Sequence, residues 1–276
     1  MKPDFRTALT RYRLSCRLVL LVLAGAAALP AFAETPLPSE LSADSLQAQP
    51  AAPAPAYARW QSSLDAFALN DKQQRPASDG VLFVGSSTIR LWSRLSQDFR
   101  QVPVLLNRGF GGSTMRDCNA LVRELVIQYK PRQVMVYAGD NDLAEGRTPE
   151  AVLNSFANFV RSVRAELPDA RISYISIKPS PLRVALLPKI RETNALIASY
   201  VQTVPHARYI DIFNPMLTEG GLPRPELFLA DQLHLNDAGY RLWQTVIAAD
   251  LSLAPWVAEV TAEPPARPLL QAATNR

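Results

Sequence analysis

Five short apolar runs alternate along the chain with longer segments whose apolar residues recur every three or four positions. The runs span residues 81–84, 102–106, 133–138, 171–177 and 207–213. Apolar runs of this length, without polar alternation, are typical of strands covered on both faces. The segments with helical spacing are 57–70, 88–98, 114–129, 149–167, 187–203 and 236–252.

This alternation predicts a parallel sheet with helices on both sides. We therefore expect one domain over residues 57–255, a three-layer α/β/α sandwich built on a flavodoxin-like, parallel five-stranded sheet. In open parallel sheets, ligands bind beyond the carboxyl ends of the strands. A functional site is then expected among the loops at 85–88, 107–114, 139–147, 178–188 and 214–235.

The first 33 residues have the pattern of a secretory signal peptide. Basic residues precede an uncharged apolar run at 18–29, and Ala31-Phe32-Ala33 follows it. A membrane anchor needs about 20 apolar residues, and this run is shorter. We expect cleavage after Ala33, a Pro- and Ala-rich linker over 34–56, and a similar tail over 256–276. The mature protein is then periplasmic or secreted, with no stable membrane span.

Charge and cysteine content exclude two other classes of protein. The net charge is +4, and outside the N-terminus the lysines and arginines are scattered, so no nucleic-acid footprint is visible. After signal cleavage Cys118 would be the single cysteine, which leaves no intrachain disulfide. Its place at apolar helical spacing predicts a buried, inert thiol.

The two histidines narrow the possible chemistry. His206 enters the last strand at its amino end and is expected in a solvated turn. His234 lies on the carboxyl edge, three residues after Asp231. A carboxylate at that spacing can fix the imidazole tautomer and leave the other nitrogen to take a proton. The pair read alone is equally consistent with polar residues that form a turn.

The other edge loops offer a nucleophile and hydrogen-bond donors. Ser86 and Ser87 follow the first strand, where either could instead cap the next helix, and position alone does not separate them. The glycines of 109–112 allow close backbone approach, and Asn141 carries a side-chain amide donor. No dinucleotide fingerprint, phosphate-binding loop or EF-hand register is present, and two histidines make a poor zinc shell. We therefore expect no metal and no cofactor.

Taken together, the four loops resemble the SGNH, or GDSL-like, family of serine esterases and lipases. The matching motifs are Gly85-Ser86-Ser87, Asn107 to Gly112, Gly139 to Asp142, and Asp231 with His234. An α/β-hydrolase fits less well, because Ile89 replaces the second glycine of its nucleophile motif.

The resemblance implies a role for each matched residue. Ser87 would be the nucleophile, His234 the base and Asp231 the acid, while the Ser87 and Gly112 N–H groups and the Asn141 side chain would form the oxyanion hole. Ser86 stands where the family usually has Asp, so the hydrogen bonding of that loop departs from the family pattern.

The expected activity is hydrolysis of a carboxylic ester of a small molecule, a carbohydrate or a lipid, with a short acyl or acetyl group. Two alternatives remain at this point: transfer of the acyl group to a sugar, and an inactive exported binding module. Apolar side chains near the loops are expected to flank the pocket or to pack beneath it; they are Trp92, Phe110, Leu182 and Leu186. The segment from Lys178 to Arg183 would shape one side of the pocket.

Overall fold

The computed structural model describes residues 54–252. The expected signal peptide (1–33), most of the linker (34–56) and the tail (256–276) lie outside the described residues. The first helix, α1 (Ala54–Gln73), begins three residues before the expected start of the domain.

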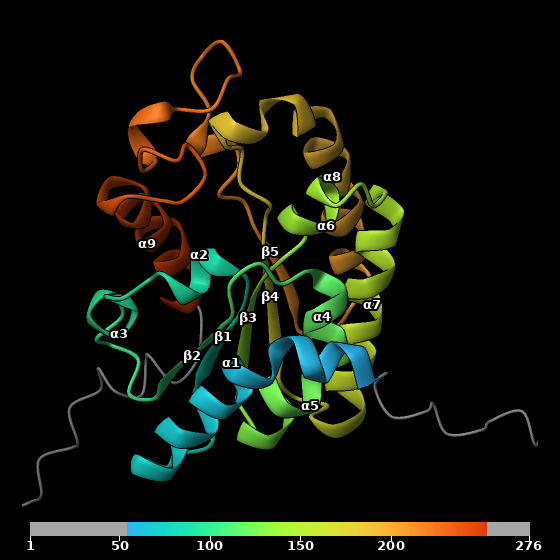
Figure 1. The fold of residues 1–276 in the computed structure, drawn as a ribbon, viewed down its shortest axis with the longest axis vertical. Coiled ribbons are helices and arrows are strands. Elements are labelled where there is room, and N and C mark those ends of the chain that lie inside the picture. Colours follow the sequence, from blue (N-terminus) through green and yellow to red (C-terminus); the bar gives the residue numbers. More distant parts are fainter. Residues whose placement is uncertain (1–53, 253–276) are drawn as a thin grey trace, which may run out of the picture. The chain divides into compact units, whose positions relative to one another are not determined.

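A parallel sheet of five strands confirms the predicted fold class (Figure 1). Its strand order is β2-β1-β3-β4-β5, so the chain starts near the middle, moves to one edge and then crosses to the other. The strands are β1 (Val81–Gly85), β2 (Leu105–Gly109), β3 (Gln133–Tyr137), β4 (Arg171–Ile175) and β5 (Ala207–Ile210).

Helices cover both faces of the sheet, and each face has its own apolar core (Figure 1). One face packs against α1, α4 (Met115–Ala120), α5 (Val122–Leu125), α7 (Pro149–Glu166) and α8 (Leu187–Gln202). The other packs against α2 (Ser87–Arg90), α3 (Leu95–Asp98) and α9 (Asp237–Ser252). Within 54–252, no helix has the length and apolar character needed to cross a membrane.

Two segments expected as continuous helices are broken in the structure. Residues 88–98 form α2 and α3, separated by turns in which the Trp92 and Leu95 N–H groups bond to carbonyls three residues back. Ile89, Trp92, Leu95 and Phe99 are nonetheless all buried, so the spacing identified the correct inner face. Residues 114–129 likewise form α4, α5 and the 3-10 helix η2 (Ile127–Tyr129).

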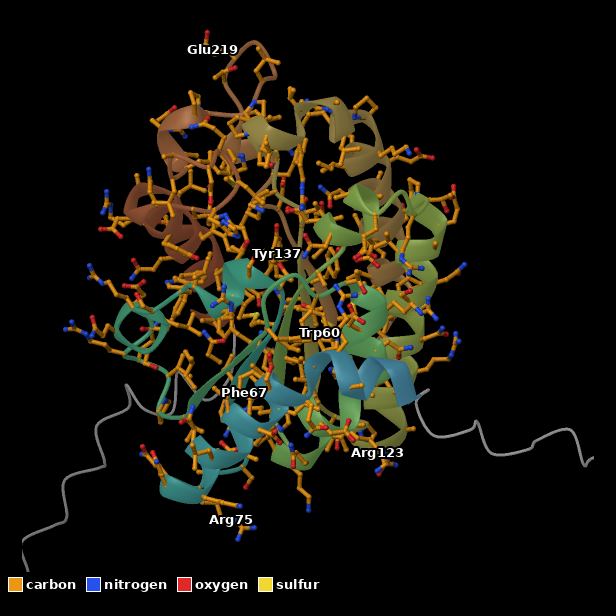
Figure 2. All side chains as sticks on the ribbon, in the orientation of Figure 1. Trp60, Phe67, Arg75, Arg123, Tyr137 and Glu219 are labelled. Atoms are coloured by element: carbon orange, nitrogen blue, oxygen red, sulfur yellow. The ribbon has the colours of Figure 1, made fainter. Side chains whose placement is uncertain are left out.

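The second strand lies three residues later than its apolar run suggested, at Leu105–Gly109 instead of 102–106. β2 is an edge strand, and its last three residues, Asn107 to Gly109, depart from the apolar pattern that marked the other strands. Arg108 is buried all the same, because its guanidinium lies 2.5 Å from Asp71 of α1 and packs on the rings of Phe67 and Tyr129. Figure 2 shows Phe67 and Trp60 on α1.

Gly85 ends β1 in a conformation that only glycine adopts easily. Its φ is +144°, and a Cβ at this position would lie 1.8 Å from the carbonyl oxygen of Tyr137. The close approach lets the chain turn sharply into the serine pair while β1 stays paired with β3.

We predict that Gly85→Ala lowers the free energy of unfolding by about 3 kcal/mol or more, since it adds a steric clash to an unfavourable φ. Gly146→Ala is the matched control, because Gly146 also has a positive φ of +86° but no atom lies within 4 Å of its added Cβ. The control should lose only about 1 kcal/mol. Urea denaturation of both variants measures this, and equal losses would contradict it.

Candidate active site

Ser87 lies at the carboxyl end of β1, as the first residue of α2. Its neighbour Ser86 occupies the N-cap position, where its carbonyl accepts the N–H groups of Ile89 and Arg90, but its side chain makes no capping bond. The Ser86 N–H donates to the Tyr137 carbonyl at 3.1 Å, and Ser86 is buried whereas Ser87 is half-buried. The structure thus separates the two serines, which position in the sequence alone did not.

His234 lies between Ser87 and Asp231. Its Nε2 is 3.0 Å from the Ser87 Oγ, and its Nδ1 is 2.6 Å from the Asp231 Oδ2. With the proton on Nδ1 donated to the carboxylate, Nε2 faces the hydroxyl as an acceptor. The structure therefore brings the predicted serine, histidine and aspartate into one hydrogen-bonded chain.

The turn itself holds Asp231 in place. Its Oδ1 accepts the backbone N–H groups of Leu233 and His234, both at 2.9 Å, so the carboxylate is fixed before it meets the ring. These bonds, led by the one from the His234 side chain, lower the pKa of Asp231 to about 2. Two residues after His234, the Asn236 side chain donates hydrogen bonds to the carbonyls of Glu226 and Phe228, which ties the end of this turn to the segment that precedes it.

The two predicted oxyanion loops adjoin each other beside this chain. The Phe110 N–H donates to the Gly85 carbonyl at 2.9 Å, which ties the 109–112 loop to the end of β1. Asn141, in α6 (Asp140–Ala144), donates from Nδ2 to the Ser113 carbonyl at 2.9 Å, next to Gly112. Gly112 has a φ of +80°, a value that favours glycine at this position.

The acidic residues flanking Asn141 have separate structural partners. The Asp142 Oδ2 accepts the Met115 N–H at 2.7 Å, and burial raises the pKa of this carboxyl. The Asp140 carboxylate lies between two cations, 2.7 Å from the Lys178 Nζ and 2.5 Å from the Arg183 Nη1. These contacts hold α6 in place on both sides of Asn141.

Sequence analysis missed this buried charge cluster of Lys178, Asp140 and Arg183. It placed Lys178 and Arg183 only in a pocket-shaping segment. Burial alone would lower the pKa of Lys178 and raise that of Asp140, but their mutual attraction outweighs it, and each pKa moves toward the charged form. The available signal was position, since Asp140 follows β3 and Lys178 follows the neighbouring β4.

The remaining candidates divide between core and surface. Trp92 and Phe110 are buried in the two cores, whereas Leu182 is 62% exposed. One edge of Trp92 also lines the groove between the α2–α3 segment and α9. Cys118 is fully buried, and burial raises the pKa of its thiol well above the usual value. His206 lies in an exposed turn at the amino end of β5, with a φ of +55°.

Two grooves of similar size differ in their relation to these residues. One, of about 910 Å³, runs beside α1 and includes none of Ser87, Asp231 and His234. The other, of about 1010 Å³, lies between the α2–α3 segment and α9 and is lined by Leu229 and Leu235. Ser87, Asp231 and His234 do not line the second groove either, but two of its lining residues lie next to His234: Leu235 follows it in the chain, and the Leu229 N–H donates to the His234 carbonyl.

The sequence model of the GDSL-like lipase/acylhydrolase family matches residues 77–242, more than half of the chain. The chain belongs to this family. The matched region begins after α1 and contains all four loops described above.

Solved structures share the fold at low sequence identity. A GDSL-like lipase from Bacteroides thetaiotaomicron superposes with a TM-score of 0.57 at 24% identity, covering 71% of this chain and 97% of its own. A lipase/acylhydrolase from Enterococcus faecalis gives 0.54 at 18%, covering 63% and 95%. A catalytic mutant of an acetylxylan esterase from Geobacillus stearothermophilus gives 0.53 at 13%, covering 64% and 96%. A search of curated proteins finds no significant match.

We predict that the contribution of Asp231 to stability depends on pH. The folded pKa of about 2 lies below the ordinary value of 3.8, so the contribution is complete above about pH 5 and is lost as the pH falls toward 2. Asp231→Asn should therefore unfold at a lower temperature than the wild type at pH 7. The effect should be small, since the side chain is 47% exposed.

Thermal unfolding of both proteins between pH 7 and pH 2.5 measures this difference. It should shrink as the pH falls below 4. A difference that stays constant or grows on acidification would contradict the assignment.

Proposed function

We propose that this protein is an exported serine esterase that hydrolyses carboxylic esters through a covalent acyl-enzyme on Ser87. The observation that carries the proposal is the position of His234, within hydrogen-bond distance of both the Ser87 hydroxyl and the Asp231 carboxylate. A hydroxyl is a poor nucleophile unless an adjacent base removes its proton, and this arrangement supplies the base.

In the first half of the reaction, the Ser87 Oγ attacks the ester carbonyl while His234 Nε2 takes its proton. Asp231 accepts from Nδ1 and stabilises the imidazolium that forms. The negative charge on the former carbonyl oxygen is received by the Ser87 and Gly112 N–H groups and by the Asn141 amide. Collapse of this intermediate breaks the bond to the alcohol, which leaves with the proton from His234.

In the second half, water takes the place of the alcohol. His234 removes a proton from the water as its oxygen attacks the acyl-enzyme, and it returns that proton to the Ser87 Oγ when the acid leaves. The same residues serve both halves, so no cofactor or metal has a step in this reaction.

The substrate we favour is an ester with a short acyl group, above all an acetyl ester. The structural neighbours include an acetyl esterase and an acetylxylan esterase by name. The alcohol can be a carbohydrate, a lipid or a small molecule. Export rests on the N-terminal sequence pattern and fits an ester of the cell envelope or the surroundings.

Ser87→Ala should abolish hydrolysis of p-nitrophenyl acetate and labelling by a fluorophosphonate probe, because both need the Ser87 oxygen. Ser86→Ala is the matched control, one residue away with a side chain that makes no capping bond, and it should keep most of the activity. Loss of labelling in Ser86→Ala with labelling kept in Ser87→Ala would overturn the assignment.

Asn141→Ala should lower kcat about a hundredfold, equivalent to about 3 kcal/mol, because one oxyanion donor is lost. The KM should change little, since that donor acts on charge developed in the transition state. Steady-state kinetics with thermal unfolding as a folding check measure this. Unchanged kcat in a folded variant would remove Asn141 from the mechanism.

Product analysis separates hydrolysis from acyl transfer. The enzyme is incubated with an acetyl ester in water alone and then with a sugar acceptor added. Free acetate should be the main product in both. An acetylated sugar as the main product would replace hydrolysis by transfer.

A further inference from the structure

Arg183 is the one member of the buried charge cluster that also touches a proposed catalytic residue. It lies in the 3-10 helix η3 (Pro181–Leu186), between β4 and α8. Its Nη1 is 2.5 Å from the Asp140 Oδ1, and its Nη2 donates to the Asn141 Oδ1 at 2.9 Å. The side chain is 15% exposed, so these contacts are largely shielded from water.

The Asn141 amide is therefore held at both ends. Arg183 donates to its oxygen, and its nitrogen donates one N–H to the Ser113 carbonyl. A primary amide has two N–H groups, which leaves the second for a substrate oxygen. Rotation of the amide by half a turn would set its N–H groups against the guanidinium, which has no acceptor.

We propose that Arg183 is a positioning residue that keeps the Asn141 amide in its donor orientation; the inference rests on the proposed function, in which that amide binds the oxyanion. Arg183 also acts on the strength of the donor. A cation that donates to the amide oxygen draws electron density from the nitrogen, so its remaining N–H becomes a better donor.

The rest of the cluster explains how a buried arginine is kept in place. The Asp140 carboxylate forms an ion pair with Arg183 and accepts a hydrogen bond from Lys178, whose Nζ also donates to the Tyr137 hydroxyl at 3.2 Å.

The segment around Arg183 also touches the loop that carries the histidine. The Leu182 N–H donates to the Gln232 carbonyl at 3.0 Å, within the turn between Asp231 and His234. Adjacent residues thus contact the oxyanion donor and the acid–base turn, so η3 connects the two halves of the site.

The test is a double-mutant cycle between Arg183 and Asn141, with p-nitrophenyl acetate as the substrate. Arg183→Met should lower kcat about tenfold to a hundredfold with less than a threefold change in KM, because complete loss of the donor costs about a hundredfold. In the Asn141→Ala background, Arg183→Met should change kcat less than twofold, since there is no amide left to orient.

Arg183→Met could fail to fold because it removes a cation from beside the buried Asp140. Arg183→Lys keeps that positive charge and is therefore the second variant. A lysine ammonium is a single point and cannot reproduce the two-pronged contact with Asp140 and Asn141. This variant should unfold near the wild-type temperature and still lose about tenfold in kcat; if Arg183→Met does not fold, the cycle is completed with Arg183→Lys. Arg123→Met is the control, an exposed arginine paired with Glu166, and its kcat should stay at the wild-type level.

The outcomes separate this inference from the proposed function. A wild type that hydrolyses no ester refutes the proposed function. A folded Asn141→Ala with unchanged kcat removes Asn141 from the mechanism, and the positioning role of Arg183 with it. The positioning role alone is overturned if Asn141→Ala is slow while both Arg183 variants keep wild-type kcat. It is also overturned if an Arg183 substitution acts equally in both backgrounds, or raises KM while kcat stays unchanged.

Discussion

Two backbone hydrogen bonds at the end of β1 join the loops on which the site depends. The Ser86 N–H binds the Tyr137 carbonyl of β3, and the Gly85 carbonyl binds the Phe110 N–H after β2. β1 pairs with both of these strands, so the three loops leave the sheet at neighbouring points (Figure 1). The strand order thus brings the serine, the glycine loop and Asn141 together before any side chain interacts, and Gly85 permits the approach because it has no Cβ.

Buried charge supports this arrangement at two places. Below the site, Lys178 and Arg183 balance Asp140 around Asn141. At the edge of the sheet, Arg108 of β2 is paired with Asp71 of α1, a helix outside the region matched by the family model. In each case a charge left without its partner would carry a desolvation cost of several kcal/mol, so the partners constrain each other strongly. The helix that precedes the family core is therefore joined to it by an ionic contact as well as by apolar packing.

The sequence was sufficient for the fold class and for most elements, because apolar runs and helical spacing reflect burial directly. It failed where a buried pattern does not coincide with one regular element. Residues 88–98 keep one buried face although turns separate α2 from α3, and β2 includes the polar residues Asn107 and Arg108. The candidate site residues could be predicted because each lies just after a strand or before α9, and the family resemblance implied a role for each of them. The role of Arg183 could not be predicted, since a contact between residues 42 positions apart depends on how η3 folds back over α6. Position in the sequence did not separate Ser86 from Ser87; the family resemblance did, and the structure adds that Ser86 occupies the N-cap position while the Ser87 Oγ lies 3.0 Å from His234.

The two contacts of His234, with the proposed acid Asp231 and with the proposed nucleophile Ser87, differ greatly in the length of chain that separates the partners. Asp231 and His234 are three residues apart and share one turn, whereas His234 and Ser87 are separated by 147 residues. The Asp–His contact can form as soon as a short segment adopts its local shape, but the Ser–His contact needs nearly the whole sheet to be assembled between them. Under the proposed mechanism, turnover is therefore a measure of long-range order in this domain. A state that keeps every local turn but loses the packing of α9 on the sheet would keep the Asp231–His234 contact and have no catalytic activity.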